Sequence, residues 1–264
     1  MLEGGVIFRI ESVSDFVRQV SAFVKWAEKA SVENKIIFRG QSNAVWNLVP
    51  SSQRQDKLVT KDINPAIKKE TAEKVFKQEK SMLNDFKKRS RPHLANLPGT
   101  EWEWLALAQH YGLATRLLDW TEYAGAALFF AVQKPENLLE ADIEESAVWC
   151  CIAPNEAPED RLSPFDVENV YLYKPPHIAP RITVQRGCFT IHPWCYLTKR
   201  FDWLGDKASP KYIKIVIPRS FRRGIREDLK RIGIHRASLF PELNVISSEI
   251  NKLHSTAGLD FILN

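Results

Sequence analysis

The chain has 264 residues, of which 44% are hydrophobic and 26% are charged, and its formal net charge is +5. This composition is typical of a globular protein and excludes a disordered chain or a fibre. No apolar run approaches the roughly 20 residues of a membrane-spanning helix. The first residues also lack the basic and then apolar regions of a signal peptide, so we expect a soluble cytoplasmic protein without a membrane partner.

Apolar residues at helical spacing dominate the first half of the chain. They predict helices over residues 13–27, 66–89, 101–111 and 124–132. The last of these is apolar nearly all round, so we expect it to be central and buried.

The connections between these helices carry the first polar signals. Ile36-Ile37-Phe38 predicts a short strand that stops at Arg39, with a sharp turn at Gly40. Asp119 and Glu122 precede the apolar helix, and we expect them to cap its start.

Strand-like runs replace helical patterns in the second half. They predict strands over residues 147–152, 170–173, 182–185 and 212–217, followed by a basic helix from Ser220 and a short helix over 244–253. Helices mainly early and strands mainly late predict an α+β fold. No linker divides the chain, so we expect one domain over residues 1–264, with a basic helical subregion at about 55–100.

The net charge is unevenly distributed along the chain. Residues 56–91 carry +5 and residues 211–236 carry +7, so the rest of the chain carries −7. Basic surfaces attract phosphate-bearing partners, although a charge run can also be only a solvated face. The candidate nucleic-acid surface is one face of the second basic segment, which carries Arg219, Arg222, Arg223, Arg226 and Lys230.

Standard catalytic motifs are absent from the sequence. It contains no glycine-rich phosphate loop, no GxGxxG, no HExxH and no GxSxG. The histidines and the four cysteines show no metal-ligand spacing, so we expect no metal site and no disulfide framework. The common kinase, dehydrogenase and hydrolase classes therefore have no motif in their favour.

Two polar segments within apolar sequence are the candidate site. Arg39 stands at a strand end, where its guanidinium could hold a phosphate or pair with a buried carboxylate. His110 lies in the last turn of its helix, a place that favours a protonated imidazole. Many polar groups follow before the next helix, and they need partners when buried. Arg116 could pair with Asp119, or both could face a ligand.

Phe38-Arg39-Gly40 and the block AQHYGLATRLLDWT at residues 108–121 together resemble the FRG domain family, which takes its name from the Phe-Arg-Gly signature. Matching blocks are spread over roughly residues 36–250, and one departure is Ala114, where the family usually has proline. The resemblance implies a bacterial or phage-associated domain in a defence or toxin context.

The aromatic-Arg-Gly strand end is also similar to the first-strand motif of arginine-type ADP-ribosyltransferases. This analogy implies a bent, split sheet and NAD as the substrate, with Arg39, His110 and Glu242 as catalytic residues. The residues that it implies for NAD binding are Gln41, Tyr111, Thr115, Arg116, Asp119, Trp120 and Gln185. Structural alternatives stay open, because Glu242 could cap a helix and Gln185 could satisfy a backbone group.

Different classes of function therefore remain open. One is an NAD-linked ADP-ribosyltransferase or NAD glycohydrolase that uses Arg39. Another is a nucleic-acid-binding module that uses the basic helix after Ser220. A third is a scaffold without catalysis, in which the polar block only joins helices.

Overall fold

A mixed sheet forms the centre of the computed structural model, which describes residues 6–31, 33–54, 65–134, 142–176, 183–193, 204 and 211–254. The strands are β1 (Val6–Arg9), β2 (Ile36–Gln41), β3 (Leu117–Thr121), β4 (Glu145–Ile152), β5 (Tyr171–Tyr173), β6 (Gly187–Ile191) and β7 (Tyr212–Pro218). The helices are α1 (Val13–Ala30), α3 (Pro65–Ser90), α4 (Glu101–His110), α5 (Ala124–Val132), α7 (Arg219–Arg231), α8 (Arg236–Leu239) and α9 (Leu243–His254). The α+β prediction is confirmed.

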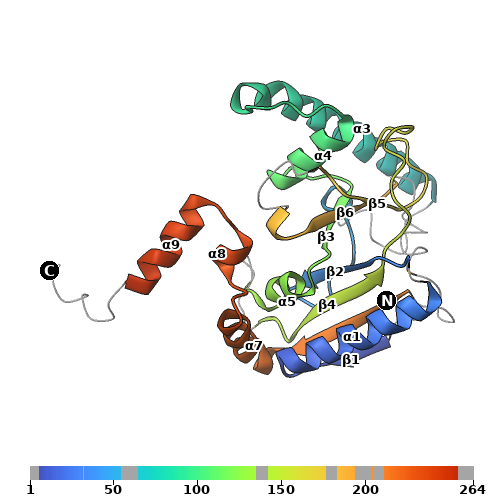
Figure 1. Cartoon of the computed structure of the whole chain (residues 1–264). Helices are drawn as coiled ribbons and strands as arrows, with labels where there is room; N and C mark the ends of the chain where they lie inside the picture. The colour runs from blue at the N-terminus through green and yellow to red at the C-terminus, as the bar shows by residue number, and fades with distance from the viewer. Residues whose placement is uncertain are drawn as a thin grey trace.

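The strand order is β1-β7-β4-β2-β3-β6-β5, with β1 parallel to β7 and the other neighbours antiparallel. The sheet has two portions that meet between β2 and β3. Along these two strands, as the structure describes them, Phe38 and Thr121 are the one pair of residues in register. In Figure 1, β3 turns away from β2 and leads into the upper portion with β5 and β6. This parting of two neighbouring strands positions the candidate site.

Helices α1, α5 and α7 cover the portion of the sheet that contains β2, β4 and β7 (Figure 1). Helix α5 is buried as predicted and packs directly on β2. A Cβ atom at Gly40 would overlap the carbonyl oxygen of Ala127 and lie 2.7 Å from the amide nitrogen of Ala131. Gly40 therefore serves the close approach of a helix to a strand.

The second portion of the sheet has its own hydrophobic cluster under α3 and α4. Trp102, Trp104 and Leu105 of α4 pack with Leu83 of α3 and with residues of β3, β5 and β6. Helix α4 begins as predicted, because the Thr100 hydroxyl accepts a hydrogen bond from the Glu103 amide at 3.1 Å.

Several local predictions are wrong. The predicted turn at Gly40 is strand, since β2 continues to Gln41 with Gly40 paired to Val148. Asp119 does not cap α5, because residues 117–121 form β3, paired along its length with β6. The strand predicted over 182–185 is also wrong: residue 182 lies outside the described residues, Thr183 and Val184 are helical, and the strand β6 begins at Gly187. Strand β1 was not predicted at all, since its four residues are too few for a periodic signal.

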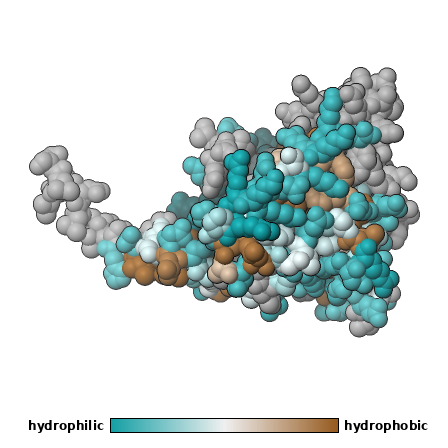
Figure 2. Space-filling view, turned by 90° about the horizontal axis from the view of Figure 1, so that it is seen from above, coloured by the Kyte–Doolittle hydropathy of each residue, from teal (hydrophilic) through white to brown (hydrophobic). Residues whose placement is uncertain are grey.

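Helix α9 extends from the body of the protein and carries an apolar stripe. Leu243, Ile246 and Ile250 of this helix are exposed. Figure 2 shows a hydrophobic patch on the left of the view, over α9.

Within the described ranges, no helix has both the length and the hydropathy of a membrane span.

Candidate functional site

A pocket of about 700 Å³ opens where β2 and β3 part. Its lining comes from strands β2 and β3, from the segment that follows β2, and from single residues of other segments. These lining residues are Phe38–Gln41, Ser42, Val45–Asn47, Val49, Arg54, Asp119–Thr121, Phe130 and Gln185. The volume lies within the range of small-molecule sites, which is roughly 300–1,000 Å³.

Arg39 lies at the point where the strands part. Its Nη1 donates a hydrogen bond to the main-chain carbonyl of Asp119 at 2.6 Å and lies 3.7 Å from the Asp119 carboxylate. Its side chain is only 15% exposed, and its Nε has no hydrogen-bond partner among the described residues. Burial lowers the pKa of Arg39, the Asp119 charge opposes this effect, and the Arg54 charge adds to it. An arginine stays protonated at neutral pH even so, hence the pocket has a fixed positive charge.

Arg54 brings a second guanidinium to the pocket. Its Nε donates to the carbonyl of Val49 at 2.9 Å, and its side chain is otherwise exposed. Sequence analysis missed Arg54, because a single arginine in a polar segment gives no local signal. Two arginines that lie near each other favour a ligand with more than one negative oxygen.

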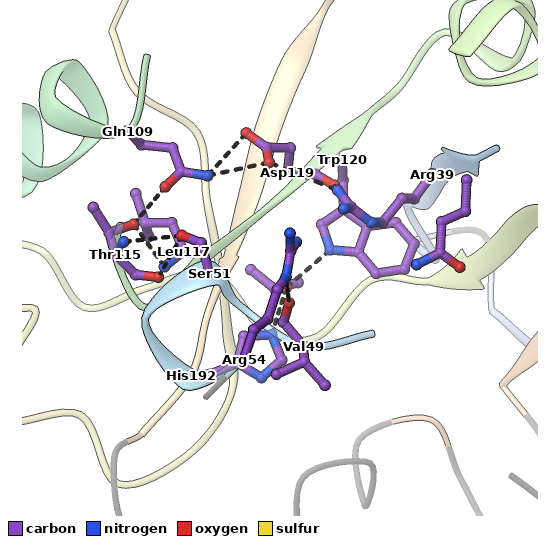
Figure 3. Close-up of polar contacts among 12 residues, drawn as sticks. Arg39, Val49, Ser51, Arg54, Gln109, Thr115, Leu117, Asp119, Trp120 and His192 are labelled. Carbon is purple, nitrogen blue, oxygen red and sulfur yellow. Dashed lines mark hydrogen bonds and ion pairs between the residues drawn. The ribbon is translucent and has the colours of Figure 1, made fainter. Parts of the chain in front are cut away.

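The Asp119 carboxylate is held by a hydrogen-bond network that starts in α4 (Figure 3). Gln109 Nε2 donates to Asp119 Oδ1 at 3.2 Å and to Oδ2 at 3.1 Å. Gln109 Oε1 accepts from the Thr115 hydroxyl at 2.6 Å, and the Thr115 amide donates to Ser51 Oγ at 3.1 Å. The carboxylate is thus oriented while its side chain remains 57% exposed.

Trp120 and Gln41 line the pocket with side chains that are already hydrogen-bonded. Trp120 Nε1 donates to the Thr190 hydroxyl at 2.9 Å, and this hydroxyl also shares a hydrogen bond with His192. Gln41 Oε1 accepts from Trp149 Nε1 at 2.7 Å. These bonds fix the shape of the pocket wall, so it is largely preformed.

The structure brings together only part of the predicted site. Arg39, Gln41, Asp119, Trp120 and Gln185 line the pocket. The predicted residues that do not line it are His110, Tyr111, Thr115, Arg116 and Glu242.

Arg116 is fully buried and belongs to an internal ion pair. Its Nε and Nη2 donate to Glu79 Oε2 at 3.1 and 3.0 Å, and its amide donates to Glu79 Oε1 at 2.6 Å. The guanidinium lies between the rings of Phe76 and Phe165. The expected pairing of Arg116 with Asp119 is therefore wrong, and Arg116 instead ties α3 to the start of β3.

The other predicted residues make contacts within the protein. His110 and Tyr111 end α4, where their rings meet edge to face at 5.1 Å between centroids. The carbonyl of Glu242 accepts bonds from the amides of Val245 and Ile246 at the start of α9, while its side-chain Oε2 is buried and has no hydrogen-bond partner among the described residues. Gln185 Nε2 donates to the carbonyl of Leu239 at 2.9 Å, so this side chain does satisfy a backbone group.

The predicted nucleic-acid surface on α7 is not a continuous exposed face. Arg222 is fully buried, and its Nη2 donates to the carbonyl of Gln133 at 2.6 Å. Arg226 donates to the carbonyl of Val132 at 2.9 Å. Both arginines thus satisfy carbonyl groups at the C-terminal end of α5, where a positive charge is favourable. Arg219, Arg223 and Lys230 are exposed.

No cluster of His, Cys, Asp and Glu that could hold a metal ion occurs among the residues described by the structure.

Comparison with known families covers the centre of the chain. Residues 34–138 match the family model described as FRG domain. This segment holds β2, α3, α4, β3 and α5, and thus most of the pocket lining, whereas the other strands of the sheet lie outside it. No curated protein and no solved structure matches the chain.

Proposed function

Because this chain carries an FRG domain over residues 34–138, we propose that the pocket of this domain binds a nucleotide through its phosphate groups, and that the nucleotide is NAD. The observation that carries the proposal is the pair of guanidinium groups, Arg39 and Arg54, that line one pocket beside the oriented carboxylate of Asp119. Arginine forks match phosphate oxygens in geometry and charge.

The shape of the pocket also supports a nucleotide. Aromatic side chains of Trp46, Trp120 and Phe130 line it together with the two arginines. Trp46 is partly exposed at the pocket, so its ring is accessible to a planar base. A pocket that combines cationic and aromatic groups suits a ligand with phosphates and a heterocycle.

The proposed reaction is ADP-ribosyl transfer or hydrolysis of NAD. In either reaction the C–N bond between nicotinamide and ribose breaks and its electron pair leaves with nicotinamide. An acceptor oxygen or nitrogen bonds to the ribose carbon and releases its proton to water. A carboxylate near that carbon stabilises the positive charge that develops there. Neither His110 nor Glu242 lines the pocket. We therefore assign the role of the carboxylate, which the analogy gave to Glu242, to Asp119.

The cellular context that we propose is bacterial defence or toxin activity, and it rests on the family resemblance. We do not propose nucleic-acid binding through α7, since Arg222 is buried and Arg226 bonds to the end of α5.

The test is calorimetric titration of NAD into the wild type, Arg54→Ala and Arg161→Ala. Arg54→Ala is expected to weaken NAD binding by about 10-fold, which corresponds to ~1.4 kcal/mol. Arg161 is the matched control, because its exposed side chain pairs with the neighbouring Asp160 and is not among the described residues that line the pocket. Equal affinity of all three proteins, or no NAD binding by any of them, would overturn the proposal.

Turnover is tested separately by following nicotinamide release with chromatography. Wild type is expected to release nicotinamide, and Asp119→Asn is expected to lower the rate by at least about 100-fold, the usual scale for a lost transition-state contact. If the protein binds NAD but releases no nicotinamide, the proposed enzymatic activity is excluded and the protein is a nucleotide-binding module.

A further inference from the structure

Resting on the proposed function, we infer that Asp119 selects ribonucleotides, by accepting hydrogen bonds from the two adjacent hydroxyl groups of the ribose next to the bound phosphates. Gln109 is the positioning residue for this carboxylate. The ligand class is therefore a phosphorylated ribose with free 2′ and 3′ hydroxyls, and deoxyribonucleotides are rejected.

The first argument is the hydrogen-bonding capacity of Asp119. It is the one carboxylate among the described residues that line the pocket, and more than half of its side chain is exposed. Gln109 uses one acceptor site on each oxygen. Each carboxylate oxygen can accept a second hydrogen bond, so two parallel acceptors remain for two neighbouring O–H donors. Acidic side chains recognise ribose hydroxyls in the same way at dinucleotide sites.

The second argument is the fixed orientation of the Gln109 amide. The Thr115 hydroxyl accepts from the Leu117 amide at 3.1 Å and donates to Gln109 Oε1 at 2.6 Å. An ionised carboxylate only accepts hydrogen bonds, so the Nε2 donors of Gln109 face Asp119. The carboxylate is held in one plane before any ligand arrives, which lowers the cost of binding a diol.

The third argument is electrostatic. A carboxylate near Arg39 opposes phosphate binding, because it repels the phosphate and partly neutralises the arginine. This repulsion is offset only when the ligand also has hydroxyl groups that donate hydrogen bonds to the carboxylate. Asp119 therefore penalises phosphate alone and favours phosphate joined to a sugar with free hydroxyls.

The experiment measures binding of ADP, 2′-deoxy-ADP, 3′-deoxy-ADP and inorganic pyrophosphate by calorimetry. ADP carries one ribose next to its phosphates, and in this experiment that ribose takes the place that the nicotinamide ribose of NAD has beside Asp119. The proteins are wild type, Asp119→Asn, Gln109→Leu and the control Asp160→Asn, whose carboxylate is exposed and outside the pocket. Wild type and the control are expected to bind ADP at least 10-fold more tightly than either deoxy analogue. In Asp119→Asn this preference is expected to fall to about 2-fold or less, while pyrophosphate binds as tightly as before or more tightly. Gln109→Leu is expected to lose part of the preference.

The outcomes separate this inference from the proposed function. Any result in which wild type fails to prefer ADP to its deoxy analogues overturns the inference, whereas NAD and pyrophosphate binding in the same protein keep the proposed function. If neither NAD nor pyrophosphate binds, both fall. If Asp119→Asn loses pyrophosphate together with ADP, Asp119 acts by holding Arg39 in place, and selection by the carboxylate is excluded. Circular dichroism confirms that each variant is folded, and the ratio of ADP to deoxy-ADP affinity does not depend on the fraction that is active.

Discussion

The Arg39 guanidinium lies closer to the main-chain carbonyl of Asp119 than to the carboxylate of the same residue. Its Nη1 lies 2.6 Å from the main-chain carbonyl oxygen of Asp119 and 3.7 Å from the carboxylate. Beyond the pair Phe38–Thr121, where the ladder between β2 and β3 stops, this side chain takes the place of a backbone hydrogen bond. The same guanidinium therefore holds the two portions of the sheet together and lines the pocket between them.

Replacement of Arg39 is expected to affect stability as well as binding. Arg39→Ala should lower the free energy of unfolding by about 1.5–3 kcal/mol, because it removes a charged donor from a carbonyl. Arg54→Ala, at an exposed side chain, should change it by less than about 0.5 kcal/mol. Urea denaturation of both variants measures the difference. Equal stability of the two would show that Arg39 does not join β2 to β3.

Gly40 is expected to tolerate no side chain. Gly40→Ala places a methyl group against the Ala127 carbonyl of α5, and the strain should cost about 3 kcal/mol or more, at the upper end for overpacking. Gly224 in α7 is the control, since a Cβ there meets nothing within 4 Å and alanine should stabilise the helix by up to about 1 kcal/mol. Thermal unfolding distinguishes the two substitutions by the sign of the shift in Tm. A stable Gly40→Ala protein would contradict the close packing of α5 on β2.

The buried ion pair of Glu79 and Arg116 is expected to show strong coupling. Glu79→Met leaves an unpaired guanidinium in the interior and should cost about 3–5 kcal/mol. Replacing both residues with methionine should cost less than the sum of the two single replacements, since no buried charge is left unpaired. A double-mutant cycle in urea measures this coupling. Additive effects would mean that the pair does not act as a unit.

Two neighbouring arginines of α7 are expected to respond differently to replacement. Arg222→Ala should destabilise the protein by about 2–3 kcal/mol, because it leaves the Gln133 carbonyl without its charged donor. Arg223 is 85% exposed and pairs with Glu227 one turn further along the same helix, so Arg223→Ala should change stability by less than about 0.5 kcal/mol. Chemical denaturation of the two variants provides the comparison. A larger loss of stability for Arg223→Ala than for Arg222→Ala would contradict the buried position of Arg222 in α7.

The thiol of Cys188 is expected to be unreactive in the folded protein. Burial raises the pKa of Cys188 to about 12, so at pH 8.5 the side chain is a thiol in the native state and partly a thiolate in the unfolded state. The unfolded state loses this proton first, so the contribution to stability decreases as the pH rises from about 9 toward 12. Labelling with iodoacetamide, followed by peptide mass spectrometry, should modify Cys188 only in denaturant. Rapid labelling of the native protein would be the contrary result.

Local patterns predicted the helices well. The helices over residues 13–27 and 101–111, the buried character of α5 and the fold class all follow from residues that lie within a few positions of one another. The resemblance to the FRG domain likewise rests on short contiguous blocks, which the family match over residues 34–138 confirms.

Strand β3 shows where local patterns fail. Its sequence Leu-Leu-Asp-Trp-Thr lacks the alternation of a half-buried strand, because all of its residues except Asp119 are buried. An acidic residue before an apolar helix then looks like a helix cap. Only the pairing with β6, which is about seventy residues further along the chain, makes the segment a strand.

The sequence alone was sufficient to find the residue types of the site and one of its two arginines, because Arg39 and Asp119 stand in distinctive blocks. Which residues share a pocket was decided by tertiary contacts between segments far apart in the chain, such as Arg39 with Asp119 and Arg116 with Glu79. An arginine has the same local signature whether it faces a ligand, a buried glutamate or the end of a helix. Its role depends on which partner the fold brings within hydrogen-bond distance, and for this reason Arg39 and Arg54 line the pocket while Arg116 and Arg222 are buried in the interior.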